Sequence, residues 1–209
     1  TTAAGAAAES TTAAPAAGAP AGGKVVRVAA VDPQVALDPQ QYTYSIVMKI
    51  TDNVTESLIT TMEDGSLEPN LLTALPEVSE DGMTYSFELL PDVASDVKYS
   101  FERLVKLTKM ATLMENVEGY KELADGAAEE MSGIQVQDDT HFTIKLVKPY
   151  APFTSVLSTG YCAIYPEAAC EEAGDTWGMQ VLYGTGPFKM DSYQSGVGVV
   201  LSRFDDYHG

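Results

Sequence analysis

Strand-like and helix-like patterns follow one another along this chain without regular alternation, and that order limits the folds it can adopt. Alternating apolar residues predict strands over residues 84–89 and a hairpin within 134–147, with a helix over 96–109 between them. Apolar positions four residues apart predict another helix over 44–58. Because a parallel barrel would need strict alternation of strand and helix, the pattern favours an α/β class with a mixed sheet.

The two ends of the patterned region add strands. Residues 24–31 read KVVRVAAV, a near-continuous apolar run that is typical of a strand buried on both faces. Two Asp-Pro pairs then predict a loop, Asp32-Pro33 and Asp38-Pro39. Near the other end, a tight turn at residues 184–187 precedes predicted strands over 188–190 and 197–203.

Residues 1–23 differ from the rest of the chain. Alanine, threonine and glycine dominate them, and they contain no large apolar residue, so they cannot contribute to a core. We interpret them as a disordered tether. Such a tether suits either a linker or a mature lipoprotein, in which a lipid-bearing cysteine would precede it.

The charge balance excludes some classes of partner. The chain has 12 Lys and Arg against 30 Asp and Glu, a net charge of −18. A non-specific nucleic-acid binder needs cations to displace phosphate counterions, and a protein held on an anionic membrane surface needs them as well. The sequence also lacks the run of about 18 apolar residues that a membrane-spanning helix requires. We therefore expect no nucleic-acid partner and no direct membrane insertion.

Motifs for catalysis and for metal binding are missing. The two histidines, His141 and His208, have no nucleophile partner in a recognisable turn, and no zinc, EF-hand or phosphate-loop motif occurs. Cys162 and Cys170 could form a disulfide or remain buried free thiols. We expect no catalytic residues, no cofactor and no metal site.

Several short motifs follow one another in a fixed order along the chain. They read LEPNLL from Leu67, LPEVSEDGMTYSFEL from Leu75, SDVKYSFER from Ser95, GTGPFK from Gly184 and DYHG from Asp206. In this order and at these separations they resemble the extracellular solute-binding proteins of family 5, the peptide- and nickel-binding receptors of ABC importers. The resemblance covers about residues 24–209, although the stretch between Leu89 and Ser95 is shorter than in the family.

The resemblance implies a periplasmic-binding-protein-like fold of type II, in which two lobes close on a ligand by hinge motion. Because family members are much longer, the chain would correspond to the first lobe. Residues 24–44 and 160–209 would form its ligand-facing subdomain. Residues 45–159 would form an inserted scaffold subdomain.

Candidate ligand contacts follow from this placement, because ligands of open sheets bind beyond the carboxyl ends of strands. Asp32 could pair with the amino terminus of a peptide, or could simply be a turn residue before proline. The tyrosines could contact ligand or pack between subdomains, and the pair at 161–162 could line the cleft or the core. The candidate residues are Val31, Asp32, Pro33, Tyr42, Tyr44, Tyr161 and Cys162.

The function that the resemblance implies is capture of peptides outside the cell and their delivery to the permease subunits of an ABC transporter. The protein would be extracellular, tethered to the outer face of the membrane through a lipid anchor, or periplasmic. Alternatives within the family are a nickel chelate, haem or an oligosaccharide as ligand. A hydrolase is a weaker alternative, because no nucleophile motif supports it.

Overall fold

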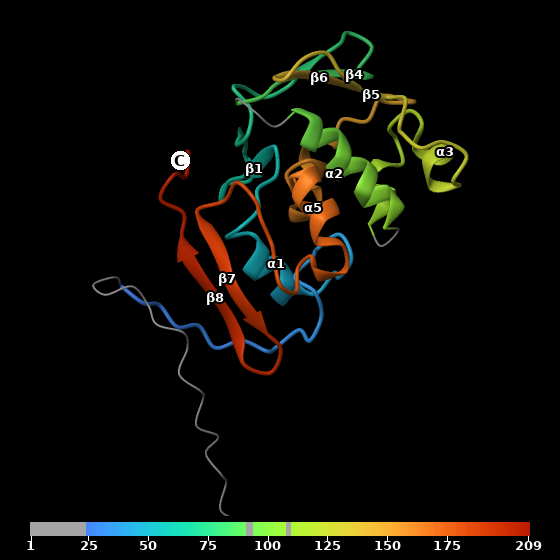
Figure 1. Ribbon diagram of the computed structural model, residues 1–209. Helices are drawn as coiled ribbons and strands as arrows, with labels where there is room; N and C mark the ends of the chain where they lie inside the picture. Colours follow the sequence, from blue (N-terminus) through green and yellow to red (C-terminus); the bar gives the residue numbers. More distant parts are fainter. Residues whose placement is uncertain (1–23, 91–93, 108–109) are drawn as a thin grey trace, which may run out of the picture.

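The computed structural model describes residues 24–90, 94–107 and 110–209. The tether predicted over residues 1–23 lies outside the described residues, and so do residues 91–93 of the shortened stretch. Figure 1 shows a four-stranded sheet at one end of the molecule and a two-stranded ribbon toward the other, with helices α1, α2 and α5 between them.

The four-stranded sheet has the order β3-β4-β6-β5, with every neighbouring pair antiparallel. Its central strands alternate buried and exposed side chains, which confirms the predicted strand and hairpin. On the inner face Phe87 stacks on its register partner Phe142, with 4.5 Å between ring centroids. The strands are β3 (Glu77–Val78), β4 (Thr84–Glu88), β5 (Ile134–Val136) and β6 (His141–Lys145).

Helix α2 (Ala94–Lys106) packs against the inner face of this sheet. Its buried stripe is the one that helical periodicity predicts, and it comprises Val97, Phe101, Leu104 and Val105. The buried residues of α2, β4, β5 and β6, with the loops and helices around them, form what we call the first core. The surrounding elements are β1 (Ile59–Thr61), β2 (Leu67–Pro69), η1 (Ala111–Met114), α3 (Tyr120–Ala124) and α4 (Phe153–Val156).

The second core joins the start of the described chain to its last third. Its buried residues are Leu37, Val47, Val54, Ala163, Tyr165, Cys170, Trp177 and Leu182. The elements around them are α1 (Ser45–Thr51), α5 (Glu167–Ala173), η3 (Gly174–Thr176), β7 (Phe188–Gln194) and β8 (Gly198–Arg203). The short helix η2 (Gly160–Cys162) directly precedes Ala163 of this core, and its own Cys162 belongs to the first core. Helix α5 begins after Pro166 and ends at Gly174, as predicted.

Two predictions of secondary structure were wrong. Residues 24–31 form no strand: their side chains are exposed, and none of their backbone groups bonds to another described residue. Val26 is 85% exposed: the apolar run is not buried, because no strand of the described ranges pairs with it. Helix α1 ends at Thr51 rather than Leu58, because the carbonyls of Asn53 and Val54 accept N–H groups from the 184–188 segment instead of continuing the helix.

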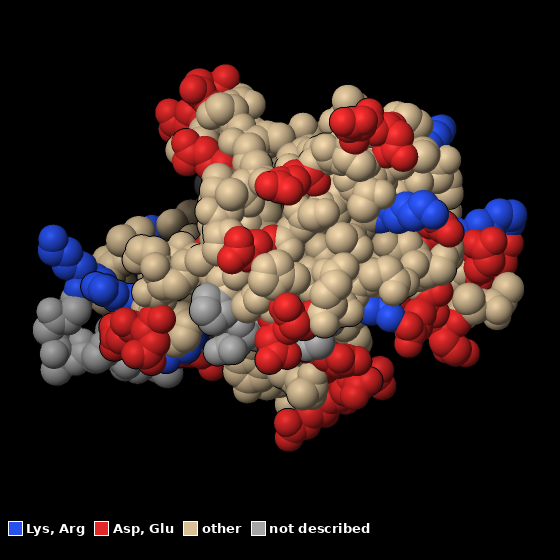
Figure 2. Space-filling model, turned by 90° about the horizontal axis from the view of Figure 1, so that it is seen from above, with Lys and Arg blue, Asp and Glu red and all other residues tan. Residues whose placement is uncertain are grey.

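Charge on the surface is mainly negative. Figure 2 shows Asp and Glu scattered over one face with few Lys and Arg among them. No helix in the described ranges combines the length and the apolar character needed to cross a bilayer.

Candidate functional site

Asp32 fastens the N-terminal segment to the turn of the β7–β8 ribbon. Its Oδ1 accepts hydrogen bonds from the Gln34 backbone N–H (3.1 Å) and the Tyr193 hydroxyl (3.1 Å). Its Oδ2 accepts from the Ser195 hydroxyl (3.0 Å) and the backbone N–H of Gly196. The N–H groups of Gln34 and Gly196, and then the hydroxyls, hold the pKa of Asp32 below its usual value. The carboxylate is therefore ionised, and a peptide amino group would have to share it with four intrachain donors.

The two neighbours of Asp32 differ in exposure. Val31 is 82% exposed and Pro33 is half-buried. The Gln34 backbone has a positive φ of 54°, an uncommon conformation for a residue other than glycine, and it turns the chain toward the second core. Residues 31–33 thus lie on the surface beside the ribbon turn.

The two candidate tyrosines differ in exposure. Tyr42 is partly buried and packs against the second core. Tyr44 is 54% exposed and directly precedes α1, in extended conformation. Of the two, Tyr44 has the surface that a ligand could contact.

Tyr161 and Cys162 lie in η2, between the two cores. The Tyr161 carbonyl accepts a hydrogen bond from Gln40 Nε2 at 3.3 Å, which ties η2 to the loop that follows the N-terminal segment. Cys162 is fully buried in the first core, so the structure places it in the core rather than in a cleft. Burial raises the pKa of the Cys162 thiol to about 12, which keeps it protonated and unreactive. Both cysteines are free and buried, the second of the predicted alternatives.

The turn at residues 184–187 has a structural role in this arrangement. A Cβ on Gly184 would meet the Val54 carbonyl oxygen and would lie 2.8 Å from the Thr55 Cα, so only glycine allows the approach. Next to it, the Gly186 N–H donates to the Val54 carbonyl at 3.0 Å. The turn therefore binds the ribbon to the end of α1.

The C-terminal residues dock on a carboxylate that the sequence patterns did not single out. Tyr207 Oη donates to Glu56 Oε1, and His208 Nε2 lies at the same distance, 2.9 Å, from Glu56 Oε2. Burial, and then the adjacent carboxylate, raises the pKa of Tyr207. Glu56 is only 9% exposed. The DYHG motif was the sequence signal that pointed to Tyr207 and His208. It gave no indication of Glu56, which lies 151 positions before Tyr207.

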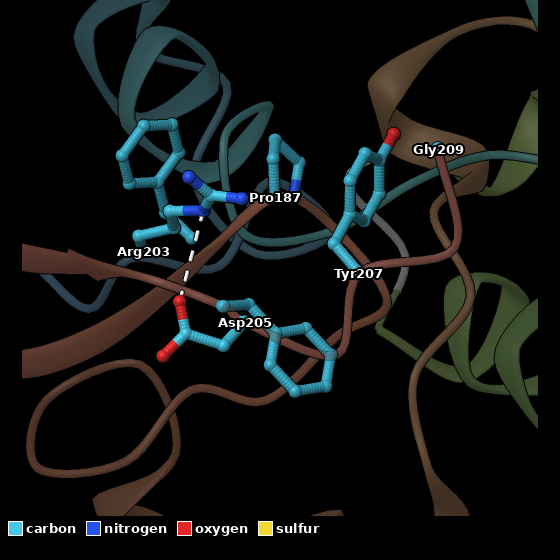
Figure 3. A pocket seen from close by; sticks show the side chains of 7 residues that line it. Pro187, Arg203, Asp205, Tyr207 and Gly209 are labelled. Atoms are coloured by element: carbon cyan, nitrogen blue, oxygen red, sulfur yellow. Dashed lines mark ion pairs between the residues drawn. The ribbon is translucent and has the colours of Figure 1, made fainter.

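A shallow hollow of about 240 Å³ lies beside this motif, at the end of the ribbon that is remote from Asp32. Figure 3 shows Arg203 and Asp205 paired at its edge (3.7 Å) and the Tyr207 ring opposite them. A ribbon of this length separates the hollow from Asp32 by about 20 Å. The hollow is open and holds no buried charge, and none of the candidate residues predicted from the sequence lines it. The lining residues are Pro187, Phe188, Arg203, Phe204, Asp205, Tyr207 and Gly209.

The described ranges hold no cluster suited to binding a metal ion, and both histidines lie beside a carboxylate. His141 Nδ1 lies 2.9 Å from Asp138 Oδ1 and 3.0 Å from the hydroxyl of its neighbour Thr140 at an exposed turn, and His208 Nε2 is paired with Glu56. Within residues 24–90, 94–107 and 110–209, no three His, Cys, Asp or Glu side chains gather in a way that could hold a metal ion.

Comparison with known proteins gives a consistent result. Residues 66–209 match the family model of the bacterial extracellular solute-binding proteins, family 5. The chain is 28% identical over 162 residues to the dipeptide-binding protein of Escherichia coli strain K12, a match that covers 64% of this chain and 28% of that protein.

Solved structures resemble the chain over most of its length. The substrate-binding domain of an oligopeptide ABC transporter from Bacillus anthracis strain Ames has a TM-score of 0.76 at 20% identity, over 83% of this chain and 36% of that one. Haemophilus influenzae OppA in complex with the peptide RPPGFSPFR has a TM-score of 0.75 at 22% identity, over 85% of this chain and 37% of that one.

These likenesses establish the fold. It is the type II periplasmic-binding-protein-like fold, with mixed helix and sheet, and the chain spans less than two-fifths of the length of these neighbours. Proteins of the matched family are extracellular or periplasmic, and the relatives are named as binding proteins rather than enzymes. The chain belongs to the bacterial extracellular solute-binding proteins of family 5.

Proposed function

We propose that this chain is the first lobe of a solute-binding subunit of an ABC importer, which captures peptides and passes them to a membrane permease. The family match over residues 66–209 carries the proposal. A curated relative is named for dipeptide binding, and a structural neighbour holds a nine-residue peptide. These names support peptide as the ligand class.

The peptide would contact the loop at Val31, Asp32 and Pro33, together with Tyr44 and the accessible part of Tyr161. Tyr42 would support this surface from beneath, since it packs on the second core. Residues 24–31 present backbone N–H and C=O groups that no described residue uses. Main-chain hydrogen bonds of this kind hold an extended peptide whatever its side chains, which supports broad specificity.

The proposed location is the outer face of the cell membrane or the periplasm. Residues 1–23 would act as a tether that ends at a lipid anchor, and the folded part would then meet the permease without inserting into the bilayer. We propose a binding role rather than an enzymatic one, because the matched family and the named relatives are binding proteins.

The test is a thermal melt of the 209-residue chain with increasing concentrations of pooled di- to nonapeptides. A ligand that binds only the folded state raises the midpoint by mass action. We expect a saturable rise, with the peptides recovered uncleaved. A rise with nickel chelate, haem or an oligosaccharide and none with peptides would correct the ligand class, and cleaved peptide would indicate a hydrolase.

A matched pair of variants locates the site. Asp32 is half-buried and Asp64 is exposed, and each accepts the backbone N–H two residues later, at 3.1 and 2.9 Å. Asp32→Asn should weaken peptide binding several-fold, and Asp64→Asn should leave it unchanged. Equal affinities in the two variants would remove Asp32 from the site.

A further inference from the structure

Arg103 joins helix α2 to the loop that follows the N-terminal segment. Its Nη2 donates to Asp38 Oδ2 at 2.6 Å, and its Nη1 donates to Gln40 Oε1, also at 2.6 Å. The Arg103 side chain is 12% exposed and Asp38 is fully buried. This is a buried ion pair between residues 65 positions apart in the sequence.

The pair belongs to a larger buried network. Gln40 Nε2 donates to the Ser100 carbonyl of α2 (3.1 Å) and to the Tyr161 carbonyl of η2 (3.3 Å). Asp38 Oδ1 accepts the backbone N–H of Gln40 at 2.9 Å. One arginine thus connects α2, the 38–41 turn and η2.

Aromatic packing closes the network on its other side. The Arg103 guanidinium lies 5.4 Å from the centroid of the Tyr165 ring, which is itself fully buried in the second core. The Ser100 hydroxyl accepts the Tyr165 backbone N–H at 2.8 Å. Burial alone would lower the pKa of Arg103, but its bond to Asp38 more than offsets burial and the pKa rises.

Stability alone does not explain such a pair. Apolar residues of similar volume often replace a buried ion pair with no loss of stability, whereas a planar fork that donates to two acceptors fixes one geometry. The geometry fixed here is that of residues 31–44. This loop is held at Asp32 by the ribbon turn, at Leu37 by the Gly178 carbonyl (2.8 Å), and at Asp38 by Arg103.

We propose that Arg103 is a positioning residue for the ligand-facing surface, acting through Asp38 and Gln40 to hold loop 31–44 and Tyr161 in one arrangement. Arg103 itself faces the interior and contacts no ligand. Its loss frees the loop while the sheet of the first core stays folded. The positioning rests on geometry alone, and its consequence for peptide binding rests on the proposed function.

The test compares three variants on one helix by hydrogen exchange of the 209-residue chain without ligand. Arg103→Met removes the fork, Arg103→Lys keeps the charge with a single contact point, and Lys106→Met is an exposed control on the same helix. We expect the hydrogen-bonded backbone amides of Leu37, Gln40, Gln41 and Tyr42 to exchange at least tenfold faster in Arg103→Met and several-fold faster in Arg103→Lys. Amides of β4 and β6 should keep their rates, and the control should change neither set.

A double variant separates positioning from stability. Arg103→Met leaves the Asp38 carboxylate buried without its cation, and adding Asp38→Asn removes that charge. We expect the double variant to recover most of the lost melting temperature while the loop amides still exchange fast. The proposal is overturned if loop and sheet amides accelerate together, or if loop protection returns with the melting temperature. If Arg103→Met does not fold, Arg103→Lys decides by the same comparison.

Peptide titration then tests the functional consequence. If the wild-type chain binds peptide, Arg103→Met should weaken binding about tenfold and Arg103→Lys less, and unchanged affinity in both overturns that consequence. If the wild-type chain binds no peptide, the proposed function fails, while the exchange result still decides the positioning role.

Discussion

Replacing Gly184 by alanine tests the contact between the ribbon and the end of α1. The added Cβ would meet the Val54 carbonyl oxygen and lie 2.8 Å from the Thr55 Cα, both backbone atoms that cannot rotate away. The Gly184 backbone has an ordinary φ, so the clash is the whole effect. Forcing an extra carbon into such a contact costs about 1–3 kcal/mol.

Two hydrogen bonds depend on the same approach. Gly186 N–H donates to the Val54 carbonyl and Phe188 N–H to the Asn53 carbonyl, both at 3.0 Å. Each contributes about 1 kcal/mol. If the shift that relieves the clash also breaks both bonds, Gly184→Ala lowers the free energy of unfolding by roughly 3–5 kcal/mol. That is a large part of the roughly 5–15 kcal/mol of a typical domain.

The assay is urea unfolding followed by the fluorescence of Trp177, the only tryptophan, which is buried in the second core. Gly65→Ala is the matched control: its φ of 86° disfavours alanine, but an added Cβ meets nothing within 4 Å. The control should lose about 1 kcal/mol through backbone strain alone. If Gly184→Ala loses no more than Gly65→Ala, the close approach is not what holds the ribbon.

Three further predictions concern the surface, the buried carboxylate and alkaline pH. Val28→Lys should leave the melting temperature unchanged and reduce self-association in sedimentation velocity, because Val28 is 83% exposed, whereas Val97→Lys in the first core should prevent folding. Glu56→Ala should lower the free energy of unfolding by about 1–2 kcal/mol and return the pKa of Tyr207 toward its usual value, which ultraviolet titration measures. Burial, and then Cys170, raises the pKa of Tyr99 from 10.0 to about 12. The neutral phenol therefore contributes its full stability below pH 10 and loses it as the pH rises toward 12. In Tyr99→Phe, the free energy of unfolding measured in urea should fall less steeply between pH 10 and 12, and an unchanged slope would contradict this prediction.

Local periodicity predicted the elements whose partners also lie within the chain. Phe142 and Ile144 alternate with polar residues, and the β4–β6 pairing buries them as expected. The predicted buried stripe of α2 was confirmed for the same reason, because its partners in the sheet belong to the same chain. Residues 24–31 have an equally clear pattern, but an apolar strand is buried only if other strands flank it, and none of the strands in the described part of the chain does so.

The candidate site was less predictable because it depends on contacts between distant residues. Asp32 was singled out from its place before a proline, but its four donors come largely from the ribbon turn more than 160 residues away. The pairing of Asp38 with Arg103, and that of Glu56 with Tyr207, have no periodic signature. Charged side chains that meet across a fold leave no local pattern in the sequence, and so only the structure reveals them.

The two cysteines occupy different cores, and this gives the chain a pair of built-in kinetic reporters. Cys162 belongs to the first core and Cys170 to the second, and burial raises the pKa of both thiols. A thiol reagent can reach each one only when its own core opens. The two labelling rates therefore measure how often each core opens, and whether the two cores open together or separately. No label has to be engineered into the protein.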